Sequence, residues 1–227
     1  MGDREVRDDL RWTVVVPVKR LDRAKTRLST RTSDERVALA LAFARDVVAA
    51  ARACPLVTQV IAVTDDRRAA RTLADDGAHV VPDRPDAGLN PALAYGASLA
   101  DPATGVAAVS ADLPALTPGQ LALALSAAGA AGVRCFVSDV AGTGTTLLCA
   151  PPGVALEPRF GARSRAAHAA GGARELALRG ISGLRRDVDT EVDLWDAARL
   201  GVGTATATVL AAAATAAEPA RDRDCGR

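Results

Sequence analysis

The stretch T-V-V-V-P-V-K-R-L-D-R-A-K-T-R-L, from Thr13 to Leu28, joins an apolar, β-branched run to a strongly basic segment. The run from Thr13 to Val18 has the composition of a buried β-strand, since valine packs well on both faces of a sheet. Outward from this strand, apolar runs alternate with stretches of helical spacing along most of the chain. Such alternation predicts an α/β domain with right-handed crossovers and a mostly parallel sheet.

The other predicted elements follow from hydrophobic spacing and from capping residues. Further strands are predicted over residues 57–64, 78–81, 106–110, 133–138 and 145–150. Helices are predicted over residues 33–52, 66–76, 90–99, 117–128, 162–170 and 191–200. We expect residues 13–210 to form one domain after a charged N-terminal extension over residues 1–12. Residues 211–227 turn from alanine to charge, and we expect this tail to be disordered.

The bulk composition argues against several classes of protein. The formal net charge is +1 and aromatic residues make up 3% of the chain, which provides neither a basic stripe nor a base-stacking platform for nucleic acid. The N-terminal residues lack the apolar core of a signal peptide, and no apolar run is long enough to cross a membrane. The four cysteines form no C-x-x-C pair, which argues against zinc and favours a reducing cytoplasm.

The basic segment after the first strand carries the only lysines of the chain, Lys19 and Lys25, together with Arg27. Cationic side chains beside a triphosphate stabilise the charge on the departing pyrophosphate. These three residues are therefore candidates for triphosphate binding, and a solvated basic loop is the structural alternative. The motif G-x-x-x-x-G-K-[ST] is absent, so the segment is not a P-loop.

In open α/β sheets, ligands bind outside the carboxyl ends of the strands. This rule selects the segments 17–28, 64–66, 83–90, 111–114 and 139–146. Within the first three segments, we take as further candidates for nucleotide binding Pro17, Asp65, Gly88 and Asn90. The loop that ends at Asn90 would cover the base or the ribose, whereas a capping role of Asn90 at the next helix is the structural alternative.

Carboxylates at two places in the sequence suit a magnesium site. Asp112 lies just past an apolar strand, and Mg²⁺ binds through one or two carboxylates plus substrate phosphates. Asp187 and Asp189 point the same way if their segment is extended, so either could supply a second carboxylate. Thr190 and Asp193 instead have the pattern of a helix capping box. A loop or capping aspartate is the structural alternative for Asp112.

Two glycine-containing segments are candidate anion sites. Residues 139–146 read D-V-A-G-T-G-T-T, and the backbone N–H groups of such a loop can face an anion. Residues 160–164 read F-G-A-R-S before a predicted helix, and a helix N-terminus with a serine hydroxyl nearby also attracts an anion. A glycine turn and a helix cap are the structural alternatives. His168 is expected to pack against its helix or to contact the acceptor.

The order of these segments resembles the phosphoenolpyruvate or 2-phospho-L-lactate guanylyltransferase family of deazaflavin coenzyme (F-420) biosynthesis. The likeness runs from about Thr13 to Leu200. It is carried by V-P-V-K-R-L-D-R-A-K-T-R-L (16–28), D-A-G-L-N-P-A-L (86–93), S-A-D-L-P-A-L (110–116), G-T-G-T-T-L-L (142–148), F-G-A-R-S-R-A-A-H (160–168) and D-V-D-T-E-V-D-L (187–194). The last segment is shared widely among related nucleotidyltransferases, whereas the combination of the first and the fourth is specific.

The resemblance implies a Rossmann-like, three-layer nucleotidyltransferase fold of the GT-A-like kind. It also implies GTP as donor, Mg²⁺ as cofactor and pyrophosphate as product. By that similarity, the site residues are Lys25 and Asp112 for catalysis, Lys19, Lys25 and Arg27 for the triphosphate, Asp112 with Asp187 or Asp189 for the metal, and Thr146, Gly161 and Ser164 for the acid acceptor.

The implied reaction is transfer of GMP from GTP to phosphoenolpyruvate or 2-phospho-L-lactate, with in-line attack of the acceptor phosphate on the α-phosphorus. Three alternatives remain open: 3-phosphoglycerate as acceptor, a molybdopterin or sugar-phosphate acceptor, or a non-catalytic GTP-binding protein on the same fold. The alanine- and arginine-rich composition is typical of high-GC coding and, through the resemblance, favours phosphoenolpyruvate. We expect a cytoplasmic enzyme without nucleic-acid or membrane partners, and leave open whether it forms a homodimer.

Overall fold

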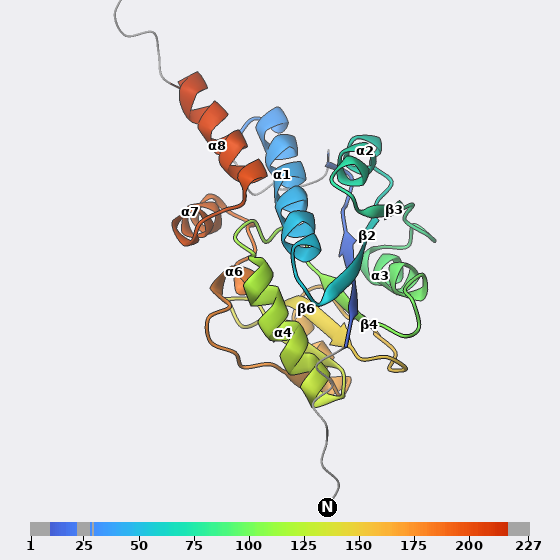
Figure 1. The fold of residues 1–227 in the computed structure, drawn as a ribbon. Coiled ribbons are helices and arrows are strands. Elements are labelled where there is room, and N and C mark those ends of the chain that lie inside the picture. Colours follow the sequence, from blue (N-terminus) through green and yellow to red (C-terminus); the bar gives the residue numbers. More distant parts are fainter. Residues whose placement is uncertain (1–9, 22–27, 29, 218–227) are drawn as a thin grey trace, which may run out of the picture.

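The structure, a computed structural model, describes residues 10–21, 28 and 30–217 (Figure 1). Within these residues, a seven-stranded mixed sheet has the order β3-β2-β1-β4-β6-β5-β7. The strands are β1 (Trp12–Pro17), β2 (Val57–Val63), β3 (His79–Val81), β4 (Gly105–Val109), β5 (Cys135–Ser138), β6 (Thr145–Ala150) and β7 (Arg174–Glu175). Every neighbouring pair is parallel except the two that β6 makes with β4 and β5. The predicted α/β fold with a mostly parallel mixed sheet is confirmed.

Helices cover both faces of this sheet. The described helices are α1 (Ser33–Arg52), α2 (Arg67–Asp75), α3 (Leu89–Ser98), α4 (Pro118–Ala131), α5 (Ser164–Ala170), α6 (Ser182–Arg185), α7 (Glu191–Leu200) and α8 (Thr204–Ala217). α1 and α4 pack on one face of the sheet, whereas α3 packs on the other (Figure 1). The result is the three-layer arrangement that a Rossmann-like fold requires.

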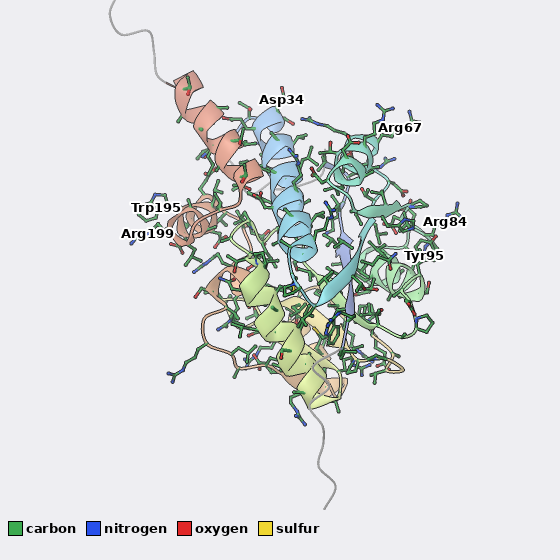
Figure 2. All side chains as sticks on the ribbon, viewed as in Figure 1. Asp34, Arg67, Arg84, Tyr95, Trp195 and Arg199 are labelled. Carbon is green, nitrogen blue, oxygen red and sulfur yellow. The ribbon has the colours of Figure 1, made fainter. Side chains whose placement is uncertain are left out.

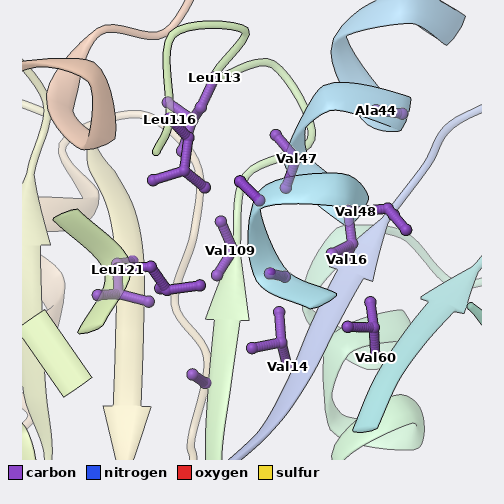
Figure 3. Close-up of a cluster of buried hydrophobic side chains, with 14 of the residues drawn as sticks. Val14, Val16, Ala44, Val47, Val48, Val60, Val109, Leu113, Leu116 and Leu121 are labelled. Atoms are coloured by element: carbon purple, nitrogen blue, oxygen red, sulfur yellow. The ribbon is translucent and has the colours of Figure 1, made fainter. Parts of the chain in front are cut away.

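The central strand β1 is buried on both faces, which explains its uninterrupted valines. Val14 and Val16 point toward α1 and join its Val48 in one hydrophobic cluster (Figure 3). Val15 points the other way, into the cluster that includes α3. Gly96 lets α3 approach the sheet closely, because a Cβ atom at this position would lie 2.6 Å from a methyl group of Val15.

The structure differs from the sequence-based prediction in β7, α6 and α8. β7 has two residues and α6 has four, which is too short for a recognisable hydrophobic period. α8 runs from Thr204 to Ala217, so the predicted disorder is wrong for residues 211–217. Alanine has the highest helix propensity of all residues, and this favours a helix there. Residues 218–227 lie outside the described residues, as do residues 1–9 of the predicted extension.

A buried aspartate of α1 holds the beginning of α8. Asp46 is 6% exposed, and its carboxylate accepts hydrogen bonds from the backbone N–H groups of Ala205 (2.9 Å) and Thr206 (3.0 Å). The first N–H groups of a helix have no partner within the helix, and the positive end of its dipole favours a carboxylate. Gly203 is needed beside this contact, because a Cβ atom there would collide with the Asp46 carboxyl group. Asp46 therefore acts as an N-terminal cap supplied from another helix.

The outer surface of α7 exposes large apolar side chains. Val192 is 67% exposed and Trp195 is 65% exposed. The Arg199 guanidinium lies 5.3 Å from the centroid of the Trp195 ring, and Figure 2 shows both side chains on the outer side of the helix. Among the described residues, no helix by itself has both the length and the apolar composition needed to cross a membrane. α7 and α8 reach the required length and composition only when they are taken together, and their axes are bent by 119° relative to each other.

Candidate active site

The order of the strands creates a crevice between the carboxyl ends of β1 and β4. From β1 the sheet continues through β2 to β3, and the chain then returns to the other side of β1 as β4. Connections leave in opposite directions at such a switch point, so a ligand site opens between them. A cavity of about 250 Å³ lies there, and its lining includes Lys19, Asp112 and Asp189. The structure thus brings together predicted site residues from three separate segments.

Asp112 and the segment before α7 are joined through the backbone. The N–H of Val188 donates to the carbonyl oxygen of Asp112 at 3.0 Å, and Val188 is fully buried. The residues on either side of Val188 are Asp187 and Asp189. Burial raises the pKa of Asp187 to about 7, and the nearby carboxylates of Asp112, Asp139 and Asp189 contribute to this rise. Several carboxylates therefore lie close enough to repel one another.

This donor set fits a hard divalent cation. Carboxylate oxygens are the ligands that Mg²⁺ and Mn²⁺ take, and a cation relieves the repulsion among neighbouring carboxylates. Thr190 and Asp193 form the predicted capping box of α7, in which the Thr190 hydroxyl accepts from the Asp193 N–H. The capping box accounts for these two residues. It does not account for the carboxylates of Asp112, Asp187 and Asp189, which the sequence predicts as metal ligands.

The glycine loop between β5 and β6 is arranged around its own aspartate. The Asp139 carboxylate, 9% exposed, accepts hydrogen bonds from the N–H groups of Thr143 (2.9 Å) and Gly144 (2.8 Å). The sequence predicts that N–H groups of this loop face an anion, and two of them face the carboxylate of Asp139. Asp139 was not predicted as a site residue. The available signal is its position directly after a buried strand, much as Asp112 lies shortly after β4.

A second cavity, of about 240 Å³, adjoins the first and shares Pro17 and Lys19 with it. Asp65, Asp83 and Asp86 line one side, and one carboxylate oxygen from each lies within 4.8 Å of the others. Burial raises the pKa of Asp83, and the Asp65 and Asp86 carboxylates raise it further. Among the described residues, the Oδ1 atom of Asp83 is buried and has no hydrogen-bond partner. This side of the cavity is therefore acidic.

The basic segment after β1 is described only in part. Lys19 lines both cavities, and its contact with the triphosphate stays a prediction. The predicted Lys25 and Arg27 lie outside the described residues. Asp66 holds the start of the segment, because its carboxylate accepts a hydrogen bond from the N–H of Leu21 at 3.0 Å while it caps α2. The sequence signal for Asp66 is an aspartate directly before a helical run.

The three predicted acceptor-binding residues lie on two segments near the same edge of the sheet. Because β6 runs antiparallel to β4, its first residues lie beside the end of β4, and the Ser110 N–H donates to the Thr146 carbonyl oxygen at 2.9 Å. Ser164 begins α5, and its N–H donates to the carbonyl oxygen of Gly161 at 3.1 Å. The exposed fractions of Thr146 and Ser164 are 1% and 2%. Their acceptor-binding role stays a prediction.

Asn90 connects the first turn of α3 to the segment before α5. It lies in the first turn of α3, whose N-cap is Gly88, so Asn90 is not the N-cap. Its side-chain oxygen accepts from the Phe160 N–H at 2.7 Å, and its side-chain nitrogen donates to the Phe160 carbonyl oxygen at 3.0 Å. Gly88 lines the second cavity, and its predicted role in nucleotide binding stays a prediction. Asn90 holds the backbone just before the predicted acceptor residue Gly161, and its predicted contact with the nucleotide stays a prediction.

The sequence is similar to guanylyltransferases along nearly its whole length. The family described as "Guanylyl transferase CofC like" matches residues 12–224. The phosphoenolpyruvate guanylyltransferase of Thermomonospora curvata is 56% identical over 206 residues, which cover 89% of this chain and 90% of that protein. The enzyme of the same name from Streptomyces coelicolor is also 56% identical, over 89% of this chain and 97% of that protein.

Solved structures of similar fold include nucleotidyltransferases. A Desulfovibrio desulfuricans G20 protein assigned as a nucleotide-diphospho-sugar transferase has a TM-score of 0.63 at 14% identity, over 90% of this chain and 95% of that one. CMP:2-keto-3-deoxy-manno-octonic acid synthetase in complex with CTP has a TM-score of 0.54 at 12% identity, over 84% and 98%. A Mycobacterium tuberculosis H37Rv protein in complex with manganese has a TM-score of 0.53 at 22% identity, over 82% and 97%. At these identities the similarity concerns the fold.

Proposed function

Because the chain belongs to the CofC-like guanylyl transferase family, we propose that it is a phosphoenolpyruvate guanylyltransferase. In this reaction a phosphate oxygen of phosphoenolpyruvate bonds to the α-phosphorus of GTP, and the bond from that phosphorus to the departing pyrophosphate breaks. The observation that carries the proposal is the similarity to relatives of this name along most of both chains. The cavity between β1 and β4 supports it, since cationic and acidic side chains meet there as nucleotidyl transfer requires.

The chain's own residues supply position and charge rather than a nucleophile or a base. The phosphate of the acceptor is already ionised, so no side chain has to remove a proton from it. Lys19, with Lys25 and Arg27 from the same segment, would neutralise the triphosphate. Asp65 and Gly88 would border the nucleoside in the second cavity.

We infer that the acceptor lies on the β6–α5 side of the crevice. Thr146, Gly161 and Ser164 would hold its carboxylate or phosphate, close to the carboxylates of Asp112 and its neighbours. Asp112, with Asp187 or Asp189, would hold a divalent cation, which we propose to be Mg²⁺. When bound, the cation would polarise the α-phosphate and offset the charge that develops on pyrophosphate.

The family resemblance supports a place for this reaction in the biosynthesis of deazaflavin coenzyme F-420. The cytoplasmic location stays a prediction, as does the absence of nucleic-acid and membrane partners, and the formation of a homodimer stays open.

The test is release of pyrophosphate from GTP and Mg²⁺ with one acid at a time. Phosphoenolpyruvate, 2-phospholactate and 3-phosphoglycerate are compared with a reaction that contains no acid, and release is coupled to a pyrophosphatase to draw the reaction forward. We expect release that depends on phosphoenolpyruvate. Release with only one of the other acids would identify that acid as the acceptor in place of phosphoenolpyruvate. Measurable GTP binding without pyrophosphate release for any acid would refute the proposed transferase activity.

A further inference from the structure

His168 is a buried side chain that the transfer chemistry does not use. It is 1% exposed and lies on α5, with its ring centroid 5.8 Å from that of Phe136 and 5.2 Å from that of Phe160. Both of its ring nitrogens nevertheless have polar partners. The backbone N–H of Arg159 donates to Nε2 at 2.9 Å, and Nδ1 lies 2.9 Å from the hydroxyl oxygen of Thr145.

These two contacts determine which nitrogen of the ring carries the proton. A backbone N–H can only donate, so Nε2 must offer its lone pair to Arg159. A neutral imidazole then carries its proton on Nδ1, and this proton is donated to the hydroxyl oxygen of Thr145. If Nε2 were also protonated, its N–H would face the N–H of Arg159, and two donors cannot bond each other. The ring is accordingly kept neutral: burial and the nearby Arg134 and Arg159 lower the pKa of His168 to about 4.

The two partners of the ring belong to the two segments that carry the predicted acceptor residues. Thr145 immediately precedes Thr146 at the start of β6. Arg159 lies two positions before Gly161, and the residue between them is the one that Asn90 holds. The planar ring thus sets the spacing between the start of β6 and the segment before α5.

We propose that His168, as the Nδ1-protonated neutral ring, is a positioning residue that holds the two halves of the acceptor-binding site in register. This inference rests on the proposed function, because it concerns the site of the acid acceptor. Misplacement of binding groups by about 1 Å is costly in a positioned reaction. Loss of either bond is therefore expected to weaken the binding of the acid and to leave the nucleotide side of the crevice unchanged.

Two substitutions separate the two bonds. In His168→Asn the amide nitrogen can take the place of Nδ1 and keep the bond to Thr145, whereas in His168→Gln the amide oxygen can take the place of Nε2 and keep the bond to Arg159. His168→Ala removes both. One lost hydrogen bond of about 1.4 kcal/mol corresponds to about a tenfold weaker interaction.

The experiment measures KM for phosphoenolpyruvate and KM for GTP in each variant by pyrophosphate release. We expect KM for the acid to rise about tenfold in His168→Asn and His168→Gln and about 100-fold in His168→Ala, with KM for GTP changed less than about twofold. Leu125→Ala, in the fully buried face of α4, is the control for lost stability, and it should leave both KM values unchanged. The ¹⁵N chemical shifts of the His168 ring in the wild-type protein should show a proton on Nδ1 alone.

The outcomes separate this inference from the proposed function. A wild-type protein that releases no pyrophosphate with any acid would refute the proposed function. An active wild type would overturn the positioning role if the three variants raised both KM values equally, if they changed neither, or if Leu125→Ala raised KM for the acid to the same extent. A ring proton on Nε2 would overturn it independently of activity.

Discussion

We expect mild acid to destabilise the fold through His168. Burial, with the guanidinium groups of Arg134 and Arg159, lowers its pKa from 6.5 to about 4. In the unfolded chain the imidazole gains a proton as the pH falls below 6.5, whereas in the folded protein the ring stays neutral down to about pH 4. The unfolded state binds more protons in this window. The free energy of unfolding therefore falls as the pH falls from 6.5 toward 4. Below pH 4 the ring is protonated in both states, so His168 causes no further loss of stability.

The size of the effect follows from the width of the window. One pH unit between the two pKa values corresponds to about 1.4 kcal/mol. A change from about pH 7 to about pH 5 crosses roughly 1.5 units of that window, so His168 is expected to lower the free energy of unfolding by about 2 kcal/mol. Domains typically have about 5–15 kcal/mol in total, which makes this loss measurable.

The assay is urea unfolding at both pH values, for the wild type and for His168→Gln. Glutamine does not titrate and can keep the bond to the Arg159 N–H, and the contributions of other ionisable groups cancel when the two proteins are compared. The wild type is expected to lose about 2 kcal/mol more than the variant between the two pH values. Equal losses, or a larger loss in His168→Gln, would show that the ring is not buried in a neutral, hydrogen-bonded state.

Three further predictions concern carboxylates. Asp112→Asn should abolish turnover while the urea midpoint stays near that of the wild type, and near-normal activity with the fold intact would contradict the metal assignment. Asp83→Asn removes the charge of a carboxylate that lines the second cavity, and a nucleoside N–H is bound more weakly by a neutral amide oxygen than by a carboxylate, so we expect KM for GTP to rise about tenfold, the equivalent of about 1.4 kcal/mol, with KM for phosphoenolpyruvate unchanged; equal changes in both would argue against a nucleotide contact. Asp46→Ala removes two bonds to the start of α8 and should cost about 2 kcal/mol in urea unfolding, whereas the exposed Asp34→Ala on the same helix should cost less than about 0.5 kcal/mol. Similar losses in these two variants would refute the capping role of Asp46.

Local chemistry explains the part of the fold that could be predicted. The valine run that forms β1 is recognisable because a strand buried on both faces is apolar at every position. Thr117 and Pro118 predict the start of α4, and Thr190 with Asp193 predicts the start of α7, because a helix cap is made within four residues. The predicted strand ends also pointed to Lys19 and Asp112 as site residues, because ligands in such sheets bind outside the carboxyl ends of the strands.

Contacts between distant segments explain what could not be predicted. Asp46 caps α8 from 159 positions away, and no spacing rule connects the two. The pKa of Asp187 reaches about 7 because burial and the Asp112 carboxylate act together on it, which requires the loop after β4 to pass beside its segment. The role of His168 likewise depends on the antiparallel direction of β6, which brings Thr145 to the same edge as the other strand ends. Local hydrophobic and capping patterns encode the strands and where they end, whereas burial and long-range pairing in the sheet decide which of those ends meet.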